Sequence, residues 1–263
     1  MSGVNYKIAL VVPCFNEANR INALYWNSIF QRIDSTLWVF VDDGSSDNTL
    51  EILNSFSEAG NVIVCAKASN EGKSEAIRLG INAVLRTNPH IDLIGYIDSD
   101  GAFTEIDIVN ITDIAVREFA DGVIRDAWLS SRIKLSGRKI ERTPYRHYLG
   151  RILTTLITLG WESAPYDTQS GFKVFANTEY FRNSLLQKFD TRWFFDIEIF
   201  VRISLTKKST LTIWEESLGS WKEVGGSHIR ISHFFIILRD CIIARRKIQT
   251  LVKEGFGGHD GSN

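Results

Sequence analysis

The stretch VFVDDGSSD, residues 39–47, joins an apolar, strand-forming run to two adjacent aspartates and a turn of glycine and serine. Burying an unpaired carboxylate costs free energy, so Asp42 and Asp43 are expected at the open end of a buried strand. Asp43 is expected to hold its own turn through backbone N–H groups. The stretch LIGYIDSDG, residues 93–101, repeats the pattern of an apolar strand that ends in an acidic turn. Two such strands indicate a sheet with an acidic rim.

Short apolar runs such as these two strands alternate with helical segments through the first half of the chain. Alternation of this kind predicts an α/β fold with a doubly wound, mostly parallel sheet and helices on both faces. Ligands of such sheets bind outside the carboxyl ends of the strands, where both acidic turns lie. The expected strands are residues 7–12, 37–41, 61–66 and 93–97, and the expected helices are about 17–31, from 47 or 48 onward, and about 72–86.

The second half of the chain is less regular. Thr143-Pro144 is a good helix start, because proline is favoured at the first helical position. From residue 229 onward, apolar residues recur at helical spacing, which predicts a C-terminal amphipathic helix. The expected organisation is one domain at 1–228, this helix at 229–252 and a disordered tail at 253–263. The other expected elements are strands at 127–132, 171–176 and 209–216, a charged loop at 133–143, and helices at 144–160 and 193–205.

Composition and charge exclude several classes of protein. The 263 residues are 44% hydrophobic with four prolines, which is typical of a packed globular protein. A formal net charge of −1 gives no basic field, so nucleic acid is not expected as a partner. The three cysteines have no metal-ligand spacing, and Cys14 and Cys65 lie in or beside apolar runs, as reduced thiols of a cytosolic protein would.

The sequence also bears on location. No apolar stretch reaches the roughly 18–20 residues that span a bilayer, and the N-terminus lacks the layout of a signal peptide. We therefore expect a cytoplasmic protein, with peripheral contact at the cytoplasmic face of a membrane as a further option. The oligomeric state stays open.

The acidic turn DSD, residues 98–100, places two carboxylates two positions apart directly after a strand. In an extended turn they can converge on one hard divalent cation, whose open positions then accept phosphate oxygens. A solvated turn is the ordinary alternative for this pattern alone. Lys73 stands at the start of a predicted helix beside a glycine, which suits an anionic ligand. Asp42 can accept a hydrogen bond from the ring N–H of a uracil base.

The loop after the first strand excludes two nucleotide-binding motifs and disfavours one class of enzyme. No G-x-G-x-x-G follows this strand, so a Rossmann dinucleotide site is excluded, and the sequence contains no P-loop. A sugar nucleotidyltransferase should carry a glycine-rich, basic loop here, but VVPCFNEAN, residues 11–19, has neither glycine nor lysine. That class stays a less favoured alternative.

Seven motifs, taken in order, resemble one enzyme family. They run from about residue 8 to residue 227 and resemble the family 2 glycosyltransferases of the GT-A fold, whose first half is a Rossmann-like nucleotide-binding unit. Within that family the similarity is closest to the polyprenyl-phosphate glycosyltransferases, notably the dolichyl-phosphate β-glucosyltransferases. The motifs are VVPCFNE (11–17), VDDGSSDNT (41–49), SNEGKSEAIRLG (69–80), YIDSDG (96–101), SSR (130–132), DTQSGFKVF (167–175) and RWFFDIE (192–198).

The resemblance implies a role for each matched residue. Asp98 and Asp100 would hold Mg²⁺ or Mn²⁺ at the diphosphate of a nucleotide sugar, and Asp100 would thereby act in catalysis. Asp196 takes the place of a catalytic carboxylate. The residues implied in nucleotide-sugar binding are Pro13, Phe15, Glu17, Asp42, Lys73, Asp98, Gln169, Ser170 and Gly171. The residues implied at an acceptor phosphate are Arg132, Arg146 and Lys173.

The acceptor decides which chemistry the site needs. A hydroxyl acceptor requires a general base such as Asp196 to remove its proton, whereas a phosphate acceptor is already anionic. A phosphate acceptor instead requires basic residues that neutralise two neighbouring phosphate groups. Basic residues cluster around the charged loop and the helix after it, namely Arg132, Arg138, Lys139, Arg142, Arg146 and Arg151.

A polyprenyl phosphate lies in a bilayer, so its enzyme has to reach a membrane. The segments 144–160 and 229–247 combine basic residues with an apolar face, as helices in the lipid headgroup layer do. Packing on the core or on a second subunit explains the same pattern. The sequence departs from many relatives in lacking their transmembrane helices, and it has Gly226-Ser227-His228 where they have glycine-serine-lysine.

These inferences predict a metal-dependent, inverting glycosyltransferase that moves a hexose, with glucose favoured, from a UDP-sugar to a polyprenyl phosphate such as dolichyl or undecaprenyl phosphate. The alternative is transfer to a hydroxyl of a lipid-linked or surface polysaccharide. A nucleotide-binding module without activity is the remaining option, but Asp98, Asp100 and Asp196 are all in place. No residue pattern separates glucose from galactose or N-acetylglucosamine.

Overall fold

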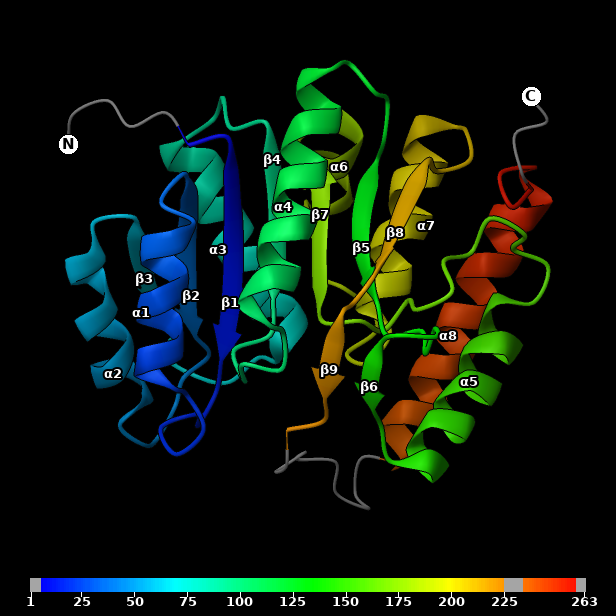
Figure 1. Cartoon of the computed structure of the whole chain (residues 1–263). Helices are drawn as coiled ribbons and strands as arrows, with labels where there is room; N and C mark the ends of the chain where they lie inside the picture. The colour runs from blue at the N-terminus through cyan, green and yellow to red at the C-terminus, as the bar shows by residue number, and fades with distance from the viewer. Residues whose placement is uncertain (1–5, 225–233, 259–263) are drawn as a thin grey trace.

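The computed structural model describes residues 6–224 and 234–258, and a seven-stranded sheet forms its centre (Figure 1). The strands of this sheet are β1 (Ile8–Cys14), β2 (Thr36–Asp42), β3 (Val62–Ala66), β4 (Leu93–Ile97), β5 (Ala127–Ser131), β7 (Phe172–Ala176) and β8 (Ile213–Ser217). Their order is β3-β2-β1-β4-β7-β5-β8. β7 runs antiparallel to both of its neighbours, and every other pair is parallel.

Helices and a small second sheet complete the fold. The helices are α1 (Ala23–Arg32), α2 (Thr49–Phe56), α3 (Lys73–Thr87), α4 (Glu105–Ala120), α5 (Pro144–Thr158), α6 (Glu179–Ser184), α7 (Phe195–Lys207) and α8 (Phe234–Lys253), with a 3₁₀ turn at Ser57–Ala59. The second sheet pairs β6 (Lys139–Glu141) in parallel with β9 (Ser220–Lys222).

Apolar side chains form a core on each face of the main sheet. Successive residues of β1 alternate between the two, with Ala9 and Val11 in one core and Leu10 and Val12 in the other. Helices α1, α2 and α4 contribute to one core, and α3, α5, α7 and α8 contribute to the other (Figure 1). Every residue of β1 is buried, as expected for a parallel strand covered on both sides. The predicted α/β fold with a doubly wound, mostly parallel sheet is confirmed.

The first helix begins later than predicted. It starts at Ala23 rather than near residue 17, because Glu17 and the residues after it form a turn in which Arg20 N donates to Glu17 O at 2.8 Å. Asn22 then caps the helix by accepting a hydrogen bond from Tyr25 N at 3.1 Å. Helices α4 and α6 and the short strands β6 and β9 were not expected from the sequence.

The C-terminal helix is part of the domain. α8 packs against α5 and α7, and Ala244, Ile248 and Leu251 lie in the same core cluster as α3 and α7. The predicted helix started at residue 229, but residues 229–233 lie outside the described part of the chain. The described helix ends at Lys253, close to the predicted end.

The tail that was expected to be disordered begins with a packed segment. In residues 254–258 the chain folds back, and Glu162 N donates to Gly257 O at 2.7 Å. Residues 259–263 lie outside the described part. No helix within 6–224 or 234–258 is both long and apolar enough to cross a lipid bilayer.

Candidate active site

The loops that follow β1 and β2 are hydrogen-bonded to each other. Asn16 N donates to Ser45 Oγ at 2.9 Å, and Glu17 N donates to Thr49 Oγ1 at 2.8 Å. Asn16 adopts a left-handed backbone conformation, with φ of 53°, which asparagine tolerates better than most residues. The first two sequence motifs therefore form one connected unit of the rim.

Asp42 lies inside this unit and is only 2% exposed. Its carboxylate accepts hydrogen bonds from the hydroxyl and the backbone N–H of Ser45, the latter at 3.3 Å. Pro13 is buried in β1, and Phe15 beside it is 38% exposed. The unit thus offers one oriented carboxylate and one accessible ring, and their contact with a nucleoside stays a prediction.

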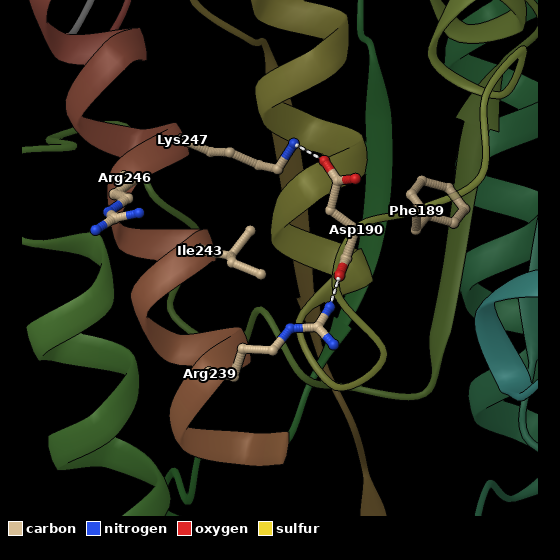
Figure 2. Close-up of a pocket in the computed structure, with 6 residues that line it drawn as sticks. All are labelled: Phe189, Asp190, Arg239, Ile243, Arg246 and Lys247. Atoms are coloured by element: carbon tan, nitrogen blue, oxygen red, sulfur yellow. Dashed lines mark hydrogen bonds and ion pairs between the residues drawn. The ribbon is translucent and has the colours of Figure 1, made fainter. Parts of the chain in front are cut away.

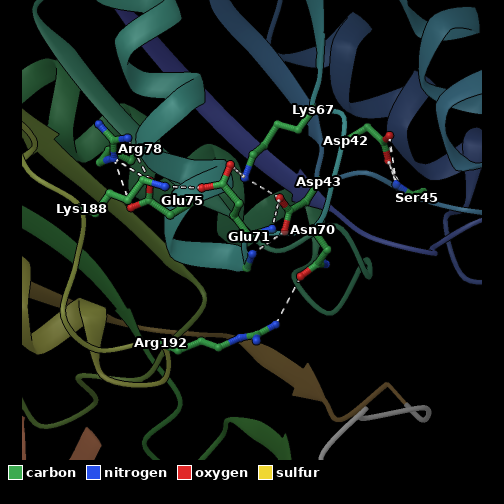
Figure 3. A network of polar contacts seen from close by, with 11 residues as sticks. Asp42, Asp43, Ser45, Lys67, Asn70, Glu71, Glu75, Arg78, Lys188 and Arg192 are labelled. Atoms are coloured by element: carbon green, nitrogen blue, oxygen red, sulfur yellow. Dashed lines mark hydrogen bonds and ion pairs between the residues drawn. The ribbon is translucent and has the colours of Figure 1, made fainter. Parts of the chain in front are cut away.

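Asp43 was expected to hold its own turn, but its carboxylate instead bonds the loop before α3 (Figure 3). Its carboxylate accepts hydrogen bonds from Lys67 Nζ at 2.7 Å, Glu71 N at 3.1 Å and Gly72 N at 2.7 Å. The local pattern could not reveal these partners, because they lie 24 to 29 residues away in the sequence. The loop in turn places Lys73 at the start of α3.

The acidic turn after β4 lies against two basic side chains. Asp98 Oδ1 pairs with Lys73 Nζ at 2.5 Å, and Asp100 Oδ2 lies 3.6 Å from the guanidinium of Arg20. A Cβ atom on Gly171 would collide with the Asp98 carboxylate, so any larger residue at that position would displace this carboxylate. The structure therefore brings together three of the predicted donor-site residues from β4, α3 and the loop before β7.

Negative charge accumulates at this turn. Burial and the carboxylates of Asp100 and Asp98 raise the pKa of Glu17 to about 7, although Arg20 opposes the shift. Burial and the charge of Asp98 also raise the pKa of Asp100. Burial lowers the pKa of Lys73, but the carboxylates of Asp98, Asp196 and Asp100 together outweigh it, so the pKa is raised overall. A further cation at the turn would relieve this repulsion.

The acidic turn fits a divalent ion held jointly by protein and substrate. Among the described residues, no three His, Cys, Asp or Glu side chains lie close enough to hold a metal by themselves. Mg²⁺ commonly takes only one or two carboxylates, because water and substrate phosphates fill its other positions. Asp98 and Asp100 meet that requirement, and the crowding that raises the pKa of Asp100 favours a cation.

Asp196, the second residue of α7, lies in a buried polar cluster. Its Oδ1 accepts hydrogen bonds from the Tyr96 hydroxyl and from Lys173 Nζ, the latter at 2.7 Å. Lys173 has no exposed surface and also donates to Ser170 O. Burial lowers the pKa of Lys173 and is opposed by the Asp196 carboxylate, whereas burial and Asp196 both raise the pKa of Tyr96. The ammonium predicted to meet a phosphate is thus directed at Asp196.

A small pocket of about 60 Å³ lies beside Arg132. Arg132 binds Asp167 through two hydrogen bonds, from Nε to Oδ2 at 2.8 Å and from a terminal nitrogen to Oδ1 at 2.7 Å. Residues from β5, the charged loop, α5 and the loop before β7 line the pocket, among them Arg132, Arg142, Arg151, Tyr166, Thr168 and Gln169.

The pocket has positive charge and unused hydrogen-bonding groups. Burial and the neighbouring charge of Arg132 lower the pKa of Arg142. Arg151 adds a third guanidinium to the lining. Thr168 Oγ1 and Gln169 Nε2 are buried and have no hydrogen-bond partner among the described residues. An anion the size of a phosphate group would satisfy these groups.

The pocket adjoins the acidic turn. Asp98 N donates to Gly171 O at 3.0 Å, and Gln169 is only two residues before this glycine. Ser170, between them, is 1% exposed and bonds the Ser130 hydroxyl, so it joins β5 to β7. Arg146 lies in α5, but its side chain is outside the described part of the structure.

No role was predicted from the sequence for several members of the site, among them Arg20, Tyr96 and Asp167. Tyr96 stands two residues before Asp98 in β4, so strand alternation indicates that the two side chains leave the same face. Asp167 was quoted within a matched motif without being given a role. Its proximity to Arg132 depends on the folded chain, because 35 residues separate them.

Comparison with known proteins identifies a family for this chain. The profile of glycosyl transferase family 2 matches residues 9–181. A dolichyl-phosphate β-glucosyltransferase of Trichomonas vaginalis is 30% identical over 244 residues, which cover 89% of this chain and 72% of that protein. The dolichyl-phosphate β-glucosyltransferase of Saccharomyces cerevisiae is 26% identical over 260 residues, which cover 90% of this chain and 74% of that protein.

Solved structures share the fold. Glucosyl-3-phosphoglycerate synthase from Mycobacterium tuberculosis, in complex with Mn²⁺, UDP-glucose and phosphoglyceric acid, has a TM-score of 0.62 and 18% identity, over 97% of this chain and 81% of that one. A mannosyltransferase from Pyrobaculum calidifontis, in complex with GDP-Man and Mn²⁺, has a TM-score of 0.59 and 15% identity, over 95% of this chain and 68% of that one. The chain is a glycosyltransferase that belongs to glycosyl transferase family 2 and has the GT-A fold.

Proposed function

We propose that this chain transfers glucose from UDP-glucose to the phosphate of a polyprenyl phosphate, with inversion at the anomeric carbon and with Mg²⁺ or Mn²⁺ at the acidic turn. Relatives named dolichyl-phosphate β-glucosyltransferases support the acceptor and the sugar. A structural neighbour in complex with Mn²⁺ and UDP-glucose supports the donor and the metal. The arginine-lined pocket beside the acidic turn is the observation that carries the proposal.

The pocket favours a phosphate acceptor over a neutral one. Guanidinium groups bind phosphate oxygens through paired, charge-assisted hydrogen bonds. Asp167 already orients Arg132 through two hydrogen bonds, whereas Arg142 has no carboxylate bonded to it among the described residues. Burial and the charge of Arg132 lower the pKa of Arg142, although Asp167 and Glu223 oppose the shift. A hydroxyl acceptor would leave this charge without an anion.

The surroundings of Asp196 point the same way. If Asp196 took a proton from a hydroxyl acceptor, Lys173 would lose the counter-charge of its buried ammonium. Leaving a buried charge uncompensated costs several kcal/mol. A phosphate acceptor avoids this cost, because its nucleophilic oxygen is already anionic. We therefore assign Asp196 to holding charge and geometry rather than to accepting a proton.

The reaction then needs no proton transfer. An oxygen of the acceptor phosphate bonds to the anomeric carbon while the bond from that carbon to the diphosphate oxygen breaks, and the electron pair leaves with UDP. Attack from the face opposite UDP inverts the configuration. Lys73 supplies positive charge beside the acidic turn, and the guanidinium groups hold the acceptor phosphate. A bound divalent ion supplies Lewis-acid stabilisation of the charge on the departing UDP.

We further propose that α5 and α8, which pack side by side, contact the membrane that holds the acceptor (Figure 1). On α5, Ile152 and Leu156 are 58% and 59% exposed at helical spacing, and Leu159, directly after the helix, is 61% exposed. On α8, Leu238 and Ile242 are 50% and 48% exposed. Apolar stripes of this kind suit the boundary between lipid headgroups and acyl chains. The acceptor's own chain would lie in the same layer.

The test uses radiolabelled UDP-glucose and two acceptors in detergent, a short polyprenyl phosphate and the polyprenol of the same length. We expect label in the lipid fraction only with the phosphate and only before a chelator is added. Glucosylation of the polyprenol without glucosylation of the phosphate would contradict the proposed acceptor. A rate that is unaffected by the chelator would contradict the proposed metal.

A further inference from the structure

The segment before α7, residues 190–193, is held in an unusual way. Its four consecutive backbone N–H groups all donate to two buried carboxylates. Glu198 accepts the first two, at 3.1 Å from residue 190 and 3.0 Å from residue 191. Asp240 Oδ2 accepts the other two, at 2.7 Å from residue 192 and 2.9 Å from residue 193. Both carboxylate residues have 0% exposure.

The two carboxylates come from different elements. Glu198 belongs to α7 itself, so it ties the segment to the helix that the segment precedes. Asp240 belongs to α8 and ties the same segment to a separate part of the fold. Asp240 Oδ1 has no hydrogen-bond partner among the described residues, and Nε of Arg239 lies 3.7 Å from it. Keeping such an oxygen buried costs free energy, so a purely stabilising role explains it poorly.

Basic residues of α8 strengthen the connection (Figure 2). Lys247 Nζ lies 2.7 Å from Asp190 Oδ2 and 3.1 Å from Glu198 Oε1. Arg239 donates to the backbone oxygen of Asp190 at 2.6 Å. These residues line an open groove of about 550 Å³ between α8 and the segment. Since two of the basic residues that line it, Arg239 and Lys247, are engaged with the segment, the groove marks an attachment of α8.

The segment reaches both halves of the candidate site. Asp196 follows it by three residues, at the start of α7. Arg192 extends in the other direction, where it donates to Asn70 Oδ1 at 3.3 Å and lies against Gly72, the residue before Lys73 (Figure 3). A shift of the segment would therefore displace the Asp196 cluster and the loop that presents Lys73.

We infer that Asp240 is a positioning residue for glucosyl transfer: from α8 it fixes the backbone at residues 192 and 193, and thereby sets the places of Asp196 and Arg192 at the site. The inference depends on the proposed function in one respect only, because glucosyl transfer is the reaction that the experiment measures. It also means that α8, the helix proposed to meet the membrane, is joined to the reaction centre through the segment at residues 190–193.

The experiment compares Asp240→Asn and Asp240→Ala with Glu254→Gln, a matched control at an exposed carboxylate just beyond α8. The asparagine variant keeps the shape of the side chain and removes the charge from its hydrogen bonds. The kcat and KM of transfer, the Kd of UDP by calorimetry and amide hydrogen exchange are measured for each protein.

We expect Asp240→Ala to lower kcat about 10- to 100-fold, the scale of a misplaced reacting group. The Kd of UDP should change by less than about twofold, because the loops at β1 and β2 are bonded to each other and, among the described residues, make no hydrogen bond to α8. Exchange should accelerate at residues 190–196 in both Asp240 variants and not in the control. The asparagine variant should lie between the alanine variant and the wild type in kcat.

Two results would overturn the inference. One is a kcat of Asp240→Ala equal to that of the wild type, and the other is a loss of kcat matched by an equal loss of UDP affinity, which indicates general damage to the fold. If the alanine variant does not fold, the same criteria apply to Asp240→Asn. Absence of transfer by the wild type would instead contradict the proposed function, and unchanged exchange at residues 190–196 would still contradict the inference.

Discussion

Replacing Lys173 by methionine tests the buried charge pair on which the acceptor assignment depends. The substitution keeps the length of the side chain and removes its ammonium. Lys173 has no exposed side-chain surface and that of Asp196 is 8% exposed, so solvent cannot replace the lost partner. Removing one member of a buried ion pair costs about 3–5 kcal/mol. Because the Tyr96 hydroxyl still donates to Asp196, we expect the lower end of that range, about 3 kcal/mol.

Urea unfolding at neutral pH measures this change. For a chain of this size, 1 kcal/mol corresponds to about 2–4 °C in Tm, so Lys173→Met should also unfold about 6–12 °C below the wild type. The matched control is Lys222→Met, whose side chain is 80% exposed and lies 3.6 Å from Glu141. A surface pair of this kind is worth about 0–1 kcal/mol.

A double variant separates charge from packing. Lys173→Met combined with Asp196→Leu replaces the pair by apolar side chains, which is often neutral for stability. We expect it to regain most of the stability that Lys173→Met loses. The reasoning is refuted if Lys173→Met is no less stable than Lys222→Met, or if the double variant is as unstable as the single one.

Three further predictions follow from the site. Asp100→Ala should abolish metal-stimulated transfer, whereas Asp113→Ala on the exposed face of α4 should not; full activity of Asp100→Ala in the presence of Mg²⁺ would contradict the metal assignment. Arg142→Gln should raise the KM of polyprenyl phosphate about tenfold or more without changing the KM of UDP-glucose. The control is Arg138→Gln, at an exposed position outside the pocket, which should change neither KM. An equal KM of polyprenyl phosphate in both variants would contradict the role of the pocket. Folding raises the pKa of Glu17 from 4.5 to about 7, so between these pH values the folded protein keeps a proton that the unfolded chain has lost. The free energy of unfolding should therefore fall by about 3 kcal/mol as the pH rises from 4.5 to 7. Glu17→Gln should remove that part of the pH dependence in urea unfolding, and parallel curves for both proteins would show that the shift is absent.

Much of the fold follows from local pattern. The strand at 93–97 is found at its predicted bounds and the other strands of the first half within about two residues, because short apolar runs can hardly be placed elsewhere than in a buried sheet. Helix α4 was missed although its signal is present: Thr104 accepts from Asp107 N as an N-cap, and Ile108, Ile111 and Ala115 share one buried face. The strands β6 and β9 are three residues long and pair across 81 positions of sequence, so no local pattern marks them.

Some contacts of the candidate site could likewise be predicted from the sequence, and others could not. The acidic turn and Lys73 were predicted to lie together, because strand ends meet at one rim, and the structure shows their ion pair. The partners of Asp43, Lys173 and Asp240 were not foreseen. Each of these charged side chains is buried against groups that only tertiary packing brings near, and the sequence shows its charge but not its partner.

The most direct test of the account is the chemical linkage of the product. UDP-glucose labelled with ¹³C at the anomeric carbon is incubated with polyprenyl phosphate, and the purified glycolipid is examined by ¹³C and ³¹P NMR. The labelled carbon should couple to a single phosphorus atom and have the β configuration. A labelled carbon without coupling to phosphorus, or one in the α configuration, would contradict transfer to a phosphate with inversion.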